Sequence, residues 1–362
     1  MAMGAMAFAT SFSVMFAAKI VIGVVSAALL TAPASILADS VAPDRRARAI
    51  GIWMVGQYIG AAFGYLVGGL VFDALTRDPA FAHALIGELA PWRLCYLIFG
   101  VSACLLLPML LVMREPSRKE RRDTDLSLSA AARQLGTYRA FLVPFVIASI
   151  FQVLSDSSLR TWLPPALVRL YGQTPGEFGG WIGMAVLLGG MFGATAGGWL
   201  AGKARKRGDT MKIPAIAALV IGASTCLAIM PNVPMVIAFF TLGTIANSVL
   251  TTVTSAIVVM RLPNELRGLV SGIFILVSVG PGLALGSSLV PAMTGVLGGP
   301  QTLGLAMAMI GVPTALLAAF FFTRVRFDDA PLSGFDREQA GTSAIADEIA
   351  GAGIADPDTR HG

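Results

Sequence analysis

Long stretches of apolar residues without charges constrain this chain more than any other feature of its sequence. Several of them reach about 18 residues or more, the length at which an α-helix crosses the hydrocarbon core of a membrane. Apolar types make up 56% of the chain and charged types only 13%, so water cannot solvate most of the folded surface. The sequence therefore predicts an all-α integral membrane protein, and the segments are too long and too uniform for a porin-like barrel.

Polar breaks divide the chain into about ten apolar spans. The first four cover residues 1–14, 16–38, 48–72 and 93–113, and the other six cover 140–171, 178–201, 212–230, 233–260, 266–292 and 301–323. The first span is too short to cross a membrane unless residues precede it. We expect a partial N-terminal bundle at 1–113, a linker at 114–138, a C-terminal six-helix bundle at 139–326 and a disordered tail at 327–362.

Basic residues gather in every second connection between the spans. They occur at 45–48, throughout the linker, at 203–212, at 261–267 and at 324–326. Because Lys and Arg mark cytoplasmic loops, the central linker and the C-terminal tail are expected in the cytoplasm. The chain is then a multi-pass protein of the plasma membrane, or of the inner membrane in a bacterium, in contact with membrane lipids. The same pattern explains the net charge of +5, so no nucleic-acid partner is expected.

The residues that enzymes and metal sites need are scarce. The only histidines are His83 and His361, and the three cysteines lie inside apolar segments without metal-ligand spacing. Only Asp156 is clearly an acid within a span, whereas a membrane-embedded enzyme needs several converging groups. We expect no metal, no cofactor and no enzymatic activity, and a membrane-embedded enzyme remains a distant alternative.

Several motifs resemble those of the major facilitator superfamily. The segment from Lys19 to Gly23 resembles the Arg-x-x-x-Gly motif of its helix four, and 33–39 followed by Arg48 resembles the exit of that helix. Trp92 with Arg93 and the 114–116 segment resemble the two ends of helix six. The resemblance implies two helical bundles that rock about a central binding site, with Met1 inside helix three. The first two helices would then be missing, and the N-terminal bundle incomplete.

Two segments are most similar to the spinster-like branch of this superfamily. They are the run from Trp162 to Leu167 and the loop from Pro263 to Arg267. That branch is associated with the export of lipids or amphiphiles, which implies a small organic or lipid-like substrate. Ser26 stands where the branch usually has an acid that serves proton coupling, so the resemblance leaves H⁺ as the coupling ion open. Gly202 likewise replaces the aspartate of the repeated Gly-x-Leu-Ala-Asp-Arg motif.

Three polar residues of one span form the main candidate site. Gln152, Asp156 and Arg160 follow one another at intervals of four, which places them on one face of a helix. Charges inside a membrane usually face a cavity or each other, so we expect this face to line the transport pathway. The alternative is that Arg160 extends to the outer membrane surface and Asp156 neutralises it.

Further candidates lie in other spans. Lys19 is expected to bind substrate or to take part in coupling, or else to extend its amine to the interface. Asn247 either contacts substrate or joins helices, and Gln57 and Tyr58 are candidate cavity residues. Two sets of small residues are expected to act in packing or gating. One is a close-packing row at Gly56, Gly60, Gly64, Gly68 and Gly69, and the other is a hinge at Gly280, Pro281 and Gly282.

These features predict a secondary active transporter that moves a small organic molecule or amphiphile by alternating access. The alternative is a truncated membrane protein that does not transport, because two missing helices would leave packing faces without partners. The sequence leaves the oligomeric state open.

Overall fold

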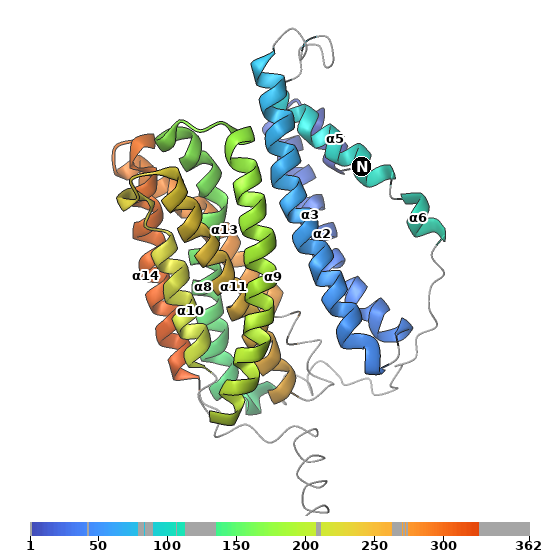
Figure 1. The fold of residues 1–362 in the computed structure, drawn as a ribbon, viewed down its shortest axis with the longest axis vertical. Coiled ribbons are helices and arrows are strands. Elements are labelled where there is room, and N and C mark those ends of the chain that lie inside the picture. The colour runs from blue at the N-terminus through green and yellow to red at the C-terminus, as the bar shows by residue number, and fades with distance from the viewer. Residues whose placement is uncertain are drawn as a thin grey trace, which may run out of the picture.

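Figure 1 shows helices arranged in two groups, which lie close together at one end and diverge toward the other. The computed structural model describes residues 2–41, 43–78, 83, 90–105, 107–112, 135–207, 211–262, 270, 272 and 274–325. Within these residues every regular element is a helix and there is no strand. The all-α fold class predicted from the apolar spans is confirmed.

The larger group contains the helices that follow the linker. They are α8 (Arg139–Tyr171), α9 (Pro175–Arg207), α10 (Lys212–Ser224), α11 (Val233–Arg261), α13 (Gly280–Val296) and α14 (Leu303–Arg324). Short 3₁₀ turns occur at Leu227–Ile229 and Pro300–Thr302, and a π-helical segment, Ile275–Val279, precedes α13. Helix α8 packs against α13 and α14. Helix α10 lies against α11 and α14, and α9 packs along α11.

Two apolar clusters form the core of this bundle. One contains Phe141, Phe145 and Phe322 near the end where α8 begins, and the other contains Leu163, Ile182 and other residues near the opposite end. Buried polar side chains lie at the levels between the two clusters, namely Ser149, Gln152, Ser155, Ser224, Thr225, Thr244 and Ser248. The bundle therefore has a polar layer near its middle, at the depth where transporters place their binding groups.

The smaller group contains α1 (Ala2–Ala7), α2 (Phe12–Ser40), α3 (Pro43–Arg77), α5 (Pro91–Leu105) and α6 (Leu107–Val112). Helix α1 lies against α2 and α5, and α3 contacts both α2 and α5. The extensive contact between the two groups is made by α3 with α9, which lie side by side at the top of Figure 1.

Six helices of the described chain are long and apolar enough to span a membrane, and three shorter ones, Phe12–Ser26, Pro91–Leu105 and Lys212–Ser224, are apolar. The expected span over 1–14 is wrong as a single helix, because α1 ends at Ala7 and α2 begins at Phe12. The Ser11 hydroxyl accepts a hydrogen bond from the Val14 N–H at 3.4 Å, which supports a new helix start there.

Another expected span ends early. The helix expected over 212–230 ends at Ser224, where Ser224 and Thr225 donate hydrogen bonds to the carbonyls of Val220 and Gly222 and compete with the helical ladder. The span expected over 93–113 consists of α5 and α6. Residues 114–134 of the expected linker, the 263–267 loop and the expected tail lie outside the described residues.

Candidate functional site

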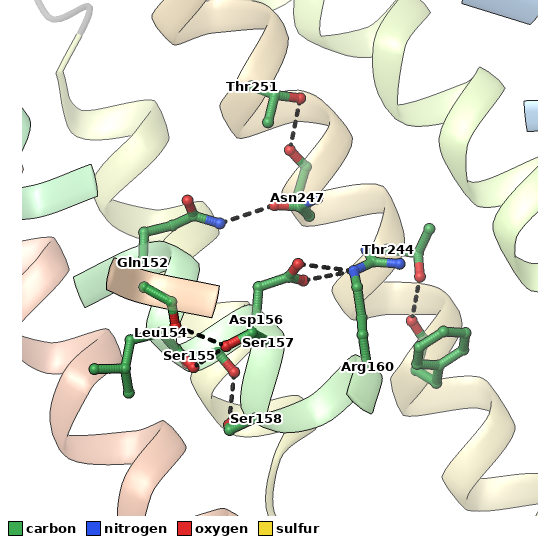
Figure 2. Close-up of polar contacts among 12 residues, drawn as sticks. Gln152, Leu154, Ser155, Asp156, Ser157, Ser158, Arg160, Thr244, Asn247 and Thr251 are labelled. Atoms are coloured by element: carbon green, nitrogen blue, oxygen red, sulfur yellow. Dashed lines mark hydrogen bonds and ion pairs between the residues drawn. The ribbon is translucent and has the colours of Figure 1, made fainter. Parts of the chain in front are cut away.

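The charged pair of α8 is the centre of the candidate site (Figure 2). The Arg160 Nε donates to both Asp156 carboxylate oxygens, at 2.9 Å to Oδ1 and 2.8 Å to Oδ2. The guanidinium also lies 5.7 Å from the centre of the Phe240 ring on α11. Both side chains are partly buried, 27% exposed for Arg160 and 16% for Asp156, so each charge is compensated within the protein.

Gln152 lies one turn before Asp156 and joins α8 to α11. Its Nε2 donates to the Asn247 Oδ1 at 2.8 Å, and the Asn247 carbonyl accepts from the Thr251 hydroxyl at 3.0 Å. The expected common face of Gln152, Asp156 and Arg160 thus continues onto α11, as Figure 2 shows. The bond between Gln152 and Asn247 also supports the alternative role of Asn247 in joining helices.

The neighbouring serines of α8 hold helices together. Ser155 donates to the Gly311 carbonyl of α14 at 2.9 Å, and Ser157 donates to the Gly282 carbonyl of α13 at 3.1 Å. Both are buried. The polar residues of this span therefore divide into a packing face of serines and a second face with the amide and the ion pair.

Tyr58 connects the two groups of helices. Its hydroxyl is 3.0 Å from the Ser248 Oγ on α11, and Ser248 itself donates to the Gly190 carbonyl on α9 at 2.7 Å. The Tyr58 ring occupies the space that a side chain at position 190 would need. A residue of the N-terminal half thus inserts its ring and hydroxyl between two helices of the C-terminal half. Gln57 is exposed.

A cavity of about 740 Å³ lies between α3, α9 and α11, at the end of the molecule where the basic connections lie. Helix α3 lines it with apolar residues and Tyr58, and α11 lines it with hydroxyls; the lining residues are Gly51, Ile52, Met54, Val55, Tyr58, Met191, Ala194, Thr195, Thr251, Thr252 and Ser255. Thr251 belongs both to this lining and to the hydrogen-bonded chain through Asn247 and Gln152. This chain of hydrogen bonds runs from the cavity to Gln152, which lies one turn before Asp156 on α8.

Lys19 lies apart from this network. Its amine donates to the Tyr96 hydroxyl of α5 at 2.8 Å and lies 5.1 Å from the centre of that ring. Within the described residues no hydrogen bond or ion pair joins Lys19 to α8 or α11. The structure therefore does not unite Lys19 with the group around Asp156.

Only part of the expected glycine row of α3 makes close packing contacts in the described part of the chain. A Cβ at Gly60 or Gly64 would meet nothing within 4 Å, and one at Gly68 would touch only the Phe99 ring at 3.7 Å. The close approach is at Gly69, the last residue of the expected row, where a Cβ would collide with the Pro175 carbonyl of α9. Within the expected row, close backbone packing is therefore found at Gly69, whereas Gly60 and Gly64 have open space beside them.

The expected hinge follows directly after the π-helical segment, with Gly280 and Pro281 at the start of α13. A Cβ at Gly282 would lie 2.7 Å from Val153 Cβ and 3.1 Å from the Ile150 carbonyl, so α13 and α8 are in close contact at this point. Gly282 is thus a packing residue, and the irregular backbone lies before it.

Sequence reasoning missed Asp73, Tyr65 and Ser248. Asp73 falls at the edge of an expected loop but is 7% exposed within α3, and Tyr65 of α3 is half-buried within electrostatic range of Asp156 and Arg160. A signal for Asp73 was present in Arg77, four residues later, which pairs with it at 3.1 Å. Nothing in the sequence distinguishes Ser248 from the many other serines and threonines of the apolar spans.

Comparison with known proteins agrees with this geometry. The family model of the Major Facilitator Superfamily matches residues 1–213 and 145–353. No curated protein matches the chain.

Two solved structures are similar in fold, both of a bacterial homolog to the human lysosomal transporter Spinster. The inward-facing, unoccupied form is 19% identical with a TM-score of 0.66, over 90% of this chain and 78% of that one. The inward-facing, occupied form is 20% identical with a TM-score of 0.69, over 91% and 81%. The fold of a membrane transporter is confirmed, and an enzyme is not indicated. The chain belongs to the Major Facilitator Superfamily and is a multi-pass integral membrane protein.

Proposed function

We propose that this protein is a secondary active transporter of the spinster-like branch that moves an amphiphile by alternating access. The observation that carries the proposal is the cavity of about 740 Å³, apolar along α3 and lined with hydroxyls along α11. Cavities of this size and lining suit an apolar tail with a few polar contacts. The Asp156 and Arg160 pair, which follows Gln152 by one turn on α8, offers opposite charges for a polar head group.

Alternating access requires two bundles that contact each other differently in two states. Helices α3 and α9 are packed closely toward one end, and the cavity opens between the same helices toward the other. The basic connections lie at the cavity end, so the proposed orientation has the cavity facing the cytoplasm, with the linker and tail on that side of the plasma membrane.

Flux into proteoliposomes tests this proposal. A fluorescent lysophospholipid is expected to cross faster with the protein than without it, and faster still under an imposed pH gradient if protons drive the step. A sugar acid serves as a comparison substrate, because Arg160 and Lys19 would also suit an organic anion. Equal flux of both compounds in protein-containing and empty vesicles would refute the proposal.

A further inference from the structure

A second cavity lies in the C-terminal half, between α8, α11 and the segment that precedes α13. Its volume is about 260 Å³. Its wall includes aromatic, aliphatic and hydroxyl side chains, namely Phe145, Thr254, Ser255, Val258, Phe274 and Ile275. Helix α11 borders both this cavity and the proposed transport cavity, and Ser255 lines both of them. The proposed transport function does not use the other residues of this second cavity.

Two phenylalanines give the second cavity an aromatic wall. The centre of the Phe145 ring lies 5.9 Å from that of Phe274, 5.3 Å from that of Phe141 and 6.3 Å from that of Phe322. Aromatic rings attract one another at centre distances of about 4.5–7 Å. A flat ring in the cavity would therefore join an aromatic cluster that already exists.

One hydroxyl of the wall is available to a ligand. Thr254 donates to the Leu250 carbonyl at 2.8 Å and to the Thr251 carbonyl at 3.1 Å, so its proton is used within α11. The Ser255 hydroxyl makes no hydrogen bond to any residue that the structure describes. None of the described residues that line the cavity is charged. Because an ionised group would lose its hydration there without gaining a counter-charge, the lining selects an uncharged ligand with one hydrogen-bonding group.

The helix wall opposite α8 is irregular where it borders the cavity. Ile275 lines the cavity and begins the π-helical segment that ends at Val279. Ser278 in this segment is fully buried, and its hydroxyl has no hydrogen-bond partner in the described part of the chain. A buried hydroxyl without a partner costs free energy, and π-helical segments often occur at functional positions. The wall thus combines an open space with a backbone geometry that is common at binding sites.

We propose that the second cavity binds an uncharged, flat compound of two fused rings that carries one hydroxyl. The rings lie against Phe145 and Phe274, and the ligand hydroxyl forms a hydrogen bond with Ser255. A protein cavity of about 150 Å³ can hold one benzene molecule, so a volume of about 260 Å³ suits two fused rings better than a larger, drug-sized molecule. The inference goes beyond the proposed transport function and does not depend on it.

Fluorine magnetic resonance with a fluoronaphthol as the probe tests the proposal. The probe is titrated into the protein in phosphatidylcholine nanodiscs, and empty nanodiscs report the part that only dissolves in lipid. We expect a saturable component with one site per protein. Fluoronaphthalene lacks the hydroxyl and is expected to bind about three- to tenfold more weakly, the factor that corresponds to one neutral hydrogen bond.

Variants locate the probe within the molecule. Val258→Phe fills the second cavity and is expected to abolish saturable binding of both probes, whereas Val168→Phe, at an exposed position of α8, should not. Ser255→Ala is expected to make the two affinities equal, and Ser287→Ala on α13, outside both cavities, should preserve the difference. Val55→Trp fills only the transport cavity and should leave the binding of the probes unchanged.

The absence of a saturable component in the parent protein would overturn the proposal, as would equal affinities of the parent protein for the two probes. Loss of binding in Val55→Trp would place the probes in the transport cavity instead. Decanol, a flexible chain with one hydroxyl, is added as a competitor, and displacement as strong as that by unlabelled naphthol would assign the cavity to a lipid chain and refute the ring selectivity. These results need no substrate flux, so failed transport of a lysophospholipid would refute only the proposed function.

Discussion

The ion pair of α8 shows how a single helix can carry two charges at membrane depth. Asp156 precedes Arg160 by one turn, and both carboxylate oxygens accept from the same guanidinium nitrogen. A lone charge at the centre of a membrane helix costs about 2.5–3.5 kcal/mol on insertion scales, so each residue stabilises the other. The pair still exposes part of both side chains, which leaves room for a ligand to replace one partner.

Replacement of Asp156 by Asn is expected to reduce transport at least tenfold while the protein still inserts, because the amide keeps the volume but cannot balance Arg160. Flux per milligram of purified protein in proteoliposomes measures the effect, with Glu177→Gln as a control acid outside the site. Transport by Asp156→Asn at the parent rate across pH would contradict a role in the pathway.

Exchange of the two charges separates structure from function. The double variant Asp156→Arg with Arg160→Asp restores an i, i+4 pair in the less favourable order, so most of the lost thermal stability should return. Transport should not return, since the charges then face the wrong parts of a head group. Recovery of both stability and flux would instead make the pair purely structural.

Tyr58→Phe tests the contact between the two halves. Loss of the hydroxyl removes the bond to Ser248 and is expected to cost about 0.5–1.5 kcal/mol, while the ring still fills the space beside Gly190. Tyr171→Phe is the control, because its hydroxyl bonds to the Leu227 and Met230 carbonyls within the C-terminal half. Both variants should melt earlier, but only Tyr58→Phe should alter the transport rate; equal rates in both would contradict the prediction.

At this scale the sequence predicted polar residues that share a helix but few of their partners. The four-residue spacing of Gln152, Asp156 and Arg160 was sufficient to predict that they share a face, because that face depends on one helix alone. The bonds from Gln152 to Asn247 and from Asp73 to Thr174 join residues that are 95 and 101 positions apart in the chain. Helix periodicity carries no information on which faces of different helices meet.

At the scale of the element, α13 combines an irregular start with close packing. The π-helical segment ends at Val279, and the buried Ser278 hydroxyl in it has no hydrogen-bond partner among the described residues. Three residues after the segment, Gly282 brings α13 against α8. Such segments widen a helix locally and often occur at functional positions.

Alanine substitutions distinguish the two glycines of this region. Gly282→Ala places a methyl group 2.7 Å from Val153 Cβ and is expected to destabilise the protein by about 1–3 kcal/mol. Gly280→Ala would meet only the Ile275 carbonyl at 4.0 Å and should leave the melting temperature nearly unchanged. Thermal unfolding in detergent provides the comparison, and equal losses in both variants would contradict the packing role of Gly282.

Hydropathy predicted the existence of these elements better than their ends. Helix α10 stops at Ser224 although apolar residues continue to Met230, because side-chain hydroxyls there bond to the backbone. The division of 1–14 at residues 8–11 was likewise invisible to a search for apolar runs. Local hydrogen bonds determine where a helix ends, whereas hydropathy indicates only whether a segment lies in lipid or in water.

At the scale of the whole molecule, α3 and α9 determine how the two halves meet. Figure 1 shows the two helices side by side toward one end, where glycines bring their backbones into contact. Their other ends border the cavity together with α11. The sequence predicted two bundles through family resemblance, but it did not predict this pair of helices or the cavity. Both depend on contacts between segments more than 100 residues apart.

A bulky residue in the cavity tests whether the divergent end is the substrate route. Val55→Trp is expected to fill part of the 740 Å³ and to reduce amphiphile flux at least tenfold, with little loss of stability because the cavity is open to accept the ring. Leu316→Trp on α14 is the matched control, an exposed apolar position outside the cavity lining. Flux in proteoliposomes and binding of the fluorescent lysophospholipid are measured for both. If the cavity holds the apolar tail, Val55→Trp weakens binding as well as flux, whereas a loss of flux with normal binding would place the tail elsewhere and limit the cavity to a role in conformational change.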